Sequence, residues 1–331
     1  MKKNGMVIVV AIFIISVILI FNGYQDSLGI SNVEKLKKIT LVTSEKVLEI
    51  APSNTLHTGG IFYQALTYNG TIPGPTIELN QGDVLNFTLK NADDIVHSID
   101  FHGIGKPSEA ISGSIKPGES KNWQIKAENP GVFVYHCDGD NLNGIWEHIS
   151  SGMFGSLIIH PKKEVPAKEF FISFNEIYND SDPGLFKENN GTVGSFDMDK
   201  FMQNQPDLIL TNGIAFKYFP VMGTITKIPL NDQAELFNVK TGELTRWYII
   251  NAGPRNEITF NFAGGMIDNI DTGFKENNNS TMNRVYEVTI PPGGGKIIET
   301  IFAEEGIYFG NDHDIGTLLK GAGFVVKSEN N

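Results

Sequence analysis

Hydrophobic and polar residues alternate along most of the chain after about residue 35, which is the pattern of half-buried β-strands. In the first half, the alternating or apolar stretches lie at 38–50, 83–91, 131–137 and 155–161. In the second half, they lie at 169–178, 244–252, 285–294, 306–312 and 321–328. Gly, Pro and Asn bound these stretches, and only residues 196–203 suggest a short helix. The pattern predicts an all-β chain built from β-sandwiches.

Two segments of the chain are similar to each other. Residues 115–137 and residues 290–312 both contain, in the same order, a Pro-Gly turn, a strand, an acidic turn, a glycine and an aromatic strand. A repeat of this kind predicts two sandwich domains in tandem. We place the first at 35–163 and the second at 164–331, joined near "KKEVPAKE".

The N-terminus differs from the rest of the chain. Lys2 and Lys3 precede an unbroken apolar run at 6–21, whose length falls between that of a signal-peptide core and that of a membrane-spanning helix. Residues 1–34 are therefore expected to form a signal or membrane anchor followed by a linker. Either would place the remainder outside the cytoplasm, as a membrane-anchored or secreted protein.

Charge and cysteine content narrow the possible functions. The formal net charge of -12 argues against nucleic acid as a partner, because phosphates would be repelled. A single cysteine excludes an internal disulfide framework, so Cys137 is either an inert buried thiol or a reactive or metal-bound one.

The surroundings of Cys137 favour a metal. His148 and Met153 follow it in the spacing Cys-x(10)-His-x(4)-Met, and His97 lies on a separate segment, "IVHSIDFHG". Two imidazoles and a thiolate with a weak thioether ligand form the blue-copper electron-transfer site. The sequence thus predicts a type 1 copper bound by His97, Cys137, His148 and Met153. The alternative is a buried structural cysteine with unrelated histidines nearby.

Two further histidines predict a second metal. His136 precedes Cys137 on a strand, so the two side chains point to opposite faces, and His97 and His102 also differ in parity. His102 and His136 should therefore meet on the face away from the thiolate. A two-histidine site requires a further ligand.

Three histidines remain as candidates for the third ligand: His57, His160 and His313. His57 and His160 are interpreted as ordinary surface or strand-end residues. His313 holds the position in the second domain that corresponds to the His136–Cys137 region, and we expect it to come from a neighbouring subunit. Seven histidines in total are too few for a three-copper oxygen-reducing cluster together with a blue-copper site.

These residues resemble the copper-containing nitrite reductases, two-domain cupredoxin members of the multicopper oxidase superfamily. The resemblance rests on "YQALTYNGTIPGPTIELNQGDVLNFTLKN", on "HSIDFHG", on "PGVFVYHC" with "WEHISSGMFGSLIIHP", and on "NDHDIGTLLKGAGFVV" in the second domain. It implies two tandem cupredoxin-like Greek-key β-sandwiches and a homotrimer with two coppers per chain. Type 2 copper would be bound by His102, His136 and a neighbouring subunit's His313. Nitrite would be reduced to nitric oxide there, with electrons from an extracytoplasmic donor such as a small cupredoxin or cytochrome.

The resemblance also implies a catalytic role for Asp100, which would hold a hydrogen bond or a proton over the type 2 copper. The chain departs from the family at the second-domain catalytic histidine, where Asn261 or a close neighbour stands, and Met266 replaces another family histidine. The ligand loop is two residues longer than usual and carries Asp138 and Asp140. Two alternatives remain: an enzyme of the same fold acting on another small substrate, and a membrane-tethered type 1 copper electron carrier.

Overall fold

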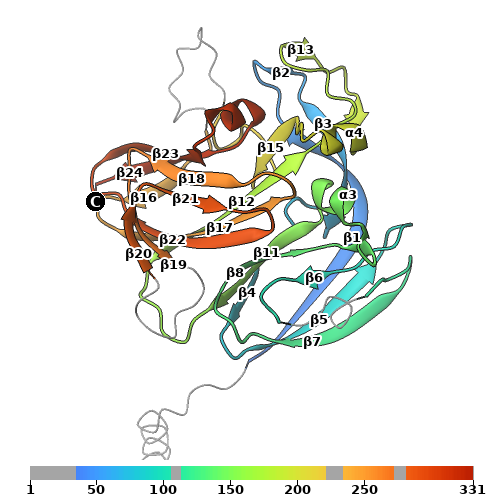
Figure 1. Ribbon diagram of the computed structural model, residues 1–331, viewed down its shortest axis with the longest axis horizontal. Coiled ribbons are helices and arrows are strands. Elements are labelled where there is room, and N and C mark those ends of the chain that lie inside the picture. The colour runs from blue at the N-terminus through green and yellow to red at the C-terminus, as the bar shows by residue number, and fades with distance from the viewer. Residues whose placement is uncertain (1–34, 106–112, 221–233, 272–280, 331) are drawn as a thin grey trace, which may run out of the picture.

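The computed structural model describes residues 35–105, 113–220, 234–271 and 281–330 (Figure 1). Strands dominate these residues and helices are few and short, which confirms the predicted all-β class. None of the helices in the described residues is long and apolar enough to cross a membrane. The apolar run at 6–21 lies outside the described residues.

The first sandwich has one five-stranded and one four-stranded sheet. In hydrogen-bonding order, the larger sheet contains β14 (Val193–Gly194), β3 (Ile61–Tyr68), β1 (Leu36–Ala51), β5 (Val84–Asn91) and β7 (Ser120–Lys126). The smaller sheet contains β4 (Ile77–Asn80), β11 (Phe154–His160), β8 (Gly131–His136) and β6 (Asp100–Phe101).

The second sandwich has a six-stranded and a five-stranded sheet. The larger contains β15 (Leu208–Thr211), β12 (Lys168–Ile177), β17 (Leu244–Gly253), β22 (Gly294–Ile301), β19 (Ile267–Asp271) and β20 (Thr281–Val285). The smaller contains β16 (Phe237–Lys240), β24 (Phe324–Glu329), β23 (Gly306–Asp312), β18 (Ile258–Ala263) and β21 (Glu287–Ile290).

Short elements complete the fold. Two small strand pairs are formed by β9 (Gly139–Asp140) with β10 (Asn143–Gly144), and by β2 (His57–Thr58) with β13 (Lys187–Glu188). Within the described ranges, the helices are α3 (Ile145–Ser150), α4 (Met198–Met202) and the 3-10 helix η2 (Ile315–Lys320). α4 lies within the helix predicted at 196–203, whereas α3 occupies a segment that the sequence did not mark as helical.

The strand order repeats between the two sandwiches. The series β3-β1-β5-β7 matches β15-β12-β17-β22, and β4-β11-β8-β6 matches β16-β24-β23-β18. Strand directions agree as well: β1/β5 and β12/β17 are parallel, while β8/β11 and β23/β24 are antiparallel. The repeat seen at 115–137 and 290–312 therefore belongs to two sandwiches of the same topology.

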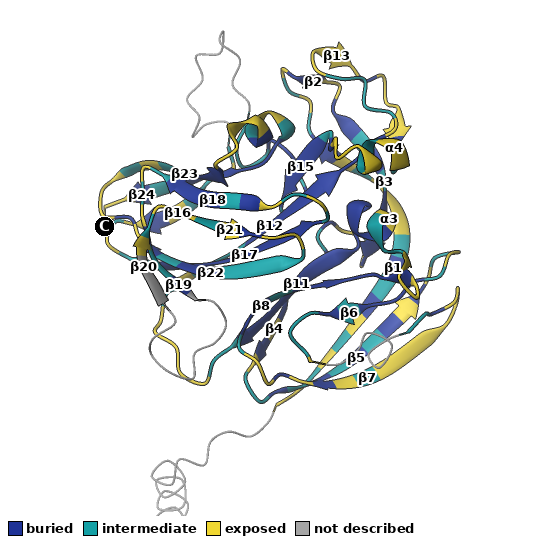
Figure 2. Cartoon of the chain, in the orientation of Figure 1, coloured by how far each residue is buried: buried dark blue, intermediate teal, exposed yellow. Residues whose placement is uncertain are grey.

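A hydrophobic cluster joins the sandwiches, because it draws residues from both. Val132 and Val134 of β8 pack in it with Tyr248 and Ile250 of β17. The alternate β8 residues Phe133 and Tyr135 face the core of the first sandwich. Figure 2 shows β8 and β11 buried along most of their length, while the edge strand β7 is largely exposed.

Candidate metal centres

The predicted type 1 ligands meet in the core of the first sandwich. Nδ1 of His148 lies 3.2 Å from Sγ of Cys137, and Nδ1 of His97 lies 3.7 Å from the same sulfur. All three side chains are buried, and their ligand atoms lie within 4.8 Å of one another. The core-facing parity of Tyr135 continues to Cys137, which explains why the thiol points inward.

Met153 lies in the turn that follows His148 and shares the buried core of Cys137. Its side chain is fully buried, its carbonyl accepts the backbone N–H of Cys137 at 3.1 Å, and its N–H donates to the His148 carbonyl at 2.9 Å. Helix α3 carries His148, and the β9–β10 hairpin links that helix to Cys137. The segment between Cys137 and Met153, expected from the resemblance to be two residues longer than usual, thus forms a hairpin followed by a helix.

Backbone N–H groups surround the sulfur. Ser98 donates its N–H to Sγ at 3.2 Å and Gly139 donates at 3.3 Å. Burial nevertheless raises the pKa of Cys137 to about 11, so the chain without a cation keeps a neutral thiol near pH 7. Burial lowers the pKa of His148 to about 4, so its imidazole is neutral and has a free lone pair. Burial also lowers the pKa of His97.

The second pair of histidines meets on the opposite side of β8. Nε2 of His102 lies 2.9 Å from Nε2 of His136, with the two rings nearly perpendicular. Asp100 joins them, with its carboxylate oxygen and both imidazole nitrogens within 4.8 Å of one another. Burial raises the pKa of Asp100 and lowers that of His102. His136 has the parity of Val132 and Val134, so it faces the junction between the sandwiches.

A hydrogen bond orients the imidazole of His102, and a carboxylate lies close to that of His136. Nδ1 of His102 lies 2.9 Å from the carbonyl oxygen of Gly293, in the second sandwich of the same chain. That contact fits an Nδ1–H donor and leaves Nε2 free to bind a metal. On the other imidazole, a carboxylate oxygen of Asp138 lies 3.2 Å from Nδ1 of His136, at ion-pair distance. Asp138, noted in the sequence only as an extra acid, thus lies beside a candidate ligand.

His313 is not part of either group within the chain. It follows β23, its side chain is 50% exposed, and its Nδ1 lies 2.5 Å from Oε2 of Glu287. Glu287 is 46% exposed. Because Nδ1 of His313 faces Glu287, Nε2 lies on the other edge of the imidazole, away from that carboxylate. This arrangement fits a ligand offered to another molecule.

Asn261 lies on β18, in register with Asn311 on one side and Glu287 on the other. It is therefore in the same sheet as the segment that carries His313, whose N–H donates to the Thr259 carbonyl at 2.7 Å. Asn261 is 2% exposed, and its Oδ1 is buried without a hydrogen-bond partner in the described part of the chain. Met266 is 39% exposed.

The remaining histidines lie apart from these groups. His160 contacts Glu164 at 3.2 Å and Tyr248 at 3.2 Å, at the end of β11. His57 begins strand β2, as the strand-end alternative predicts, and at 1% exposure it is not a surface residue. It packs against the ring of Phe216 at 5.7 Å between centroids.

Both groups fit copper by the chemistry of their donors. The first group joins a soft thiol with two neutral imidazoles in a buried core. The second brings two imidazole Nε2 atoms to 2.9 Å, a distance at which both cannot carry a proton pointing at the other. Metal binding at Cys137 would release the thiol proton, because only the thiolate is a metal ligand.

Comparisons with known proteins show similarity to copper proteins. Residues 49–164 match the multicopper oxidase family model. A copper-containing nitrite reductase of Neisseria gonorrhoeae is 29% identical over 263 residues, covering 77% of this chain and 60% of the relative. A solved copper nitrite reductase from Nitrosomonas europaea superposes with a TM-score of 0.74 at 28% identity, covering 90% of this chain and 95% of that one.

The chain is therefore similar to copper-containing nitrite reductases and to multicopper oxidases. The nitrite reductase from Thermus scotoductus, at 23% identity and a TM-score of 0.73, shares the fold. The predicted pair of cupredoxin sandwiches is thereby confirmed. The chain spans about 60% of the length of the curated copper-containing nitrite reductases that it matches.

Sequence reasoning missed several supporting residues. Asp93 lies 3.0 Å from His97, four positions away in the sequence, and this spacing was the one available signal. Glu287 is 26 positions from His313, and Gly293 is 191 positions from His102, so only the fold reveals those contacts.

Proposed function

We propose that this chain is a two-copper oxidoreductase that reduces nitrite to nitric oxide. Type 1 copper would be held by His97, Cys137, His148 and Met153, and type 2 copper by His102, His136 and His313 of the partner subunit. When bound, copper at these sites would supply one-electron transfer. One observation carries the proposal: the adjacent residues His136 and Cys137 belong to separate ligand groups on opposite sides of one strand. A single peptide unit thus links the two groups.

The protons of the reaction need a donor within the chain. Conversion of nitrite to nitric oxide and water takes up one electron and two protons. Asp100 is placed to hold one of these protons, because its carboxyl lies beside the two imidazoles and burial favours its protonated form. Asn261 can offer or accept a hydrogen bond but cannot transfer a proton near neutral pH.

A homotrimer with metal sites between subunits accounts for the exposed third ligand. Two apolar side chains of η2, the element that follows His313 in the chain, are exposed: Ile315 at 71% and Leu319 at 52%. Exposed apolar residues around a half-exposed imidazole suit burial by a second copy of the chain. Localisation outside the cytoplasm, through a signal or anchor at residues 1–34, and electron supply by a small cupredoxin or cytochrome remain part of this proposal.

A different small substrate is the second candidate. Asn261 supports it. The resemblance places Asn261 or a close neighbour where the family has its catalytic histidine, and Asn261 is a buried amide whose Oδ1 has no partner among the described residues. Such an oxygen suits a substrate that donates a hydrogen bond, as hydroxylamine does and nitrite does not. An electron carrier with type 1 copper alone would leave the pairing of His102 with His136 unexplained.

Anaerobic single turnover separates these possibilities. The fully reduced protein would be mixed with nitrite, hydroxylamine, nitric oxide or dioxygen, and reoxidation followed by the return of the visible band. Rapid reoxidation by nitrite with release of nitric oxide supports the first candidate, and reoxidation by another substrate alone supports the second. If the protein holds one copper per chain and none of the four substrates reoxidises it, the result supports the electron carrier with type 1 copper alone.

A further inference from the structure

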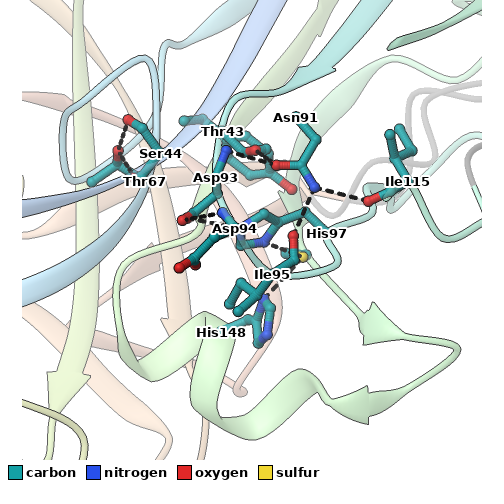
Figure 3. Close-up of polar contacts among 12 residues, drawn as sticks. Thr43, Ser44, Thr67, Asn91, Asp93, Asp94, Ile95, His97, Ile115 and His148 are labelled. Carbon is teal, nitrogen blue, oxygen red and sulfur yellow. Dashed lines mark hydrogen bonds and ion pairs between the residues drawn. The ribbon is translucent and has the colours of Figure 1, made fainter. Parts of the chain in front are cut away.

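The two histidines beside Cys137 are held in different ways. Nε2 of His97 lies 3.0 Å from Oδ2 of Asp93, and the two side chains are 0% and 7% exposed (Figure 3). The Nε2 edge of His148 instead faces the backbone at Gly144, where an added Cβ would lie 3.5 Å from Nε2. The Nε2 atom of His97 thus lies beside a carboxylate, whereas that of His148 lies beside the backbone of Gly144.

A hydrogen-bonded turn fixes the Asp93 carboxylate. Its other oxygen, Oδ1, accepts the backbone N–H of Asp94 at 2.9 Å, and the Asp93 N–H donates to Oδ1 of Asn91 at 2.9 Å. Both carboxylate oxygens are therefore committed, one to the turn and one to His97. This turn brings Asp93 and His97, four residues apart in the sequence, into contact.

Asn91 ties the turn to the body of the sandwich. It is 3% exposed, accepts the hydroxyl of Thr43 at 2.8 Å, and donates through Nδ2 to the carbonyls of Ile95 at 2.7 Å and Ile115 at 2.9 Å. Ile115 in turn exchanges backbone hydrogen bonds with His97 at 2.7 and 3.1 Å. The carboxylate and the imidazole are anchored to the same buried network, so their relative position is set before any metal arrives.

We infer that Asp93 is a positioning residue for the type 1 centre, which holds His97 with Nδ1 toward Cys137 and lowers the reduction potential of the bound copper. This inference rests on the proposed copper site at Cys137. A carboxylate on Nε2–H fixes the tautomer and makes the imidazole a stronger donor. Its negative charge, in a site of low dielectric, favours Cu(II) over Cu(I).

Asp93→Asn tests the inference with little change in shape. The amide has one oxygen for two donors, the Asp94 N–H and His97 Nε2–H, and it removes the charge. We expect a tenfold weaker preference for Cu(II), which for a one-electron couple is a rise of about 59 mV. Asp94→Asn is the matched control: it removes the same charge from an exposed neighbour and should move the potential far less.

The measurement is a redox titration of the visible band for wild type and both variants, with copper content determined in parallel. Equal potentials for Asp93→Asn and Asp94→Asn would overturn the inference while leaving the copper site in place. A wild-type protein without the intense band would remove the proposed site itself, which is a distinguishable result.

A wild-type measurement covers the case in which Asp93→Asn folds poorly. In ¹H–¹⁵N spectra of the Cu(I) protein, Nε2–H of His97 should exchange slowly with water, because it is bonded to a buried carboxylate. Asp93→Glu should retain a potential closer to wild type than Asp93→Asn does. Fast exchange of Nε2–H, or a Glu variant that matches the Asn variant, would contradict the role assigned to Asp93.

Discussion

Cys137 in the first sandwich and Asp312 in the second occupy equivalent places with different chemistry. The Cys137 sulfur accepts N–H groups from Ser98 and Gly139, and an Asp312 oxygen accepts them from Thr259 at 3.0 Å and Asp314 at 3.4 Å. In both cases one donor lies in the neighbouring segment: Ser98 two residues before β6, and Thr259 within β18. The other donor lies two residues further along the chain from the acid. Burial raises the pKa of each acid.

The residues around these two positions differ more than the backbone does. The residue before the strand donor is His97 in the first sandwich and Ile258, which is buried in the apolar core, in the second. The comparison teaches that the ring of N–H donors belongs to the sandwich fold. The imidazoles, and not the backbone, distinguish a candidate metal centre from a buried carboxylate.

The same comparison relates the two proposed catalytic residues. Asp100 pairs with His136 across β6 and β8, and Asn261 pairs with Asn311 across β18 and β23. Aligned through these pairs, Asp100 and Asn261 are equivalent positions of the two sandwiches. One carries a carboxyl beside two imidazoles, and the other carries an amide beside an amide.

Exchanging the thiol of Cys137 and the carboxyl of Asp312 between the two equivalent positions should have the largest effect on the visible spectrum. Cys137→Asp should abolish the intense visible band, because an oxygen ligand cannot give the thiolate-to-copper transition, and electron delivery should stop. Asp312→Cys should create no such band, since Ile258 replaces the imidazole there. Visible spectra with copper analysis check both, and a blue Asp312→Cys second site would refute the requirement for imidazoles.

His313→Ala should empty the second centre and spare the first. The visible band should persist at full intensity, while copper content falls from two to one per chain and turnover drops by at least about 100-fold. Copper analysis with electron paramagnetic resonance resolves the two. If two coppers per chain remain, His313 is not a ligand.

Gly293→Ala should weaken the second centre more gently. Gly293 has φ +71°, and a Cβ there would lie 3.2 Å from Cε1 of His102, whose Nδ1 meets the Gly293 carbonyl. The left-handed backbone costs about 1–2 kcal/mol for a non-glycine residue, and the shift of His102 should lower affinity for the second copper about tenfold.

Gly242→Ala is the matched control for that change. Gly242 has φ +79°, and an added Cβ would meet nothing within 4 Å. It should therefore lose a similar amount of stability in denaturant unfolding and retain both coppers in a chelator titration. Equal copper loss in the two variants would mean that backbone strain, and not contact with His102, is responsible.

The smallest effect concerns the contact between sandwiches at His160. Glu164 raises the pKa of His160, with burial opposing it, so its contribution to stability is present below the unfolded pKa of about 6.5 and is lost as pH rises through the folded value. His160→Gln should cost about 1 kcal/mol at pH 6 and less at pH 8.5. Urea unfolding at the two pH values measures this, and a larger cost at pH 8.5 would reverse the assignment.

Much of the site could be predicted from strand parity. The opposite faces of His136 and Cys137 follow from their adjacency, and the structure places these residues in two separate groups. Periodicity could not predict helix α3 around His148, because the Gly- and Asn-rich stretch before it has no amphipathic pattern. Nor could it show that Asp312 replaces the thiol, since that equivalence depends on hydrogen bonds between strands far apart in sequence.

The hydrophobic cluster shared by the sandwiches has a consequence for how the protein comes apart. Val132 and Val134 are packed with Tyr248 and Ile250 in one buried cluster. Either sandwich alone would therefore expose its side of this apolar cluster to water. A protease cut between 161 and 167 would nick the chain without releasing a soluble fragment. Loss of one half should therefore take the other with it, in a single cooperative melting event.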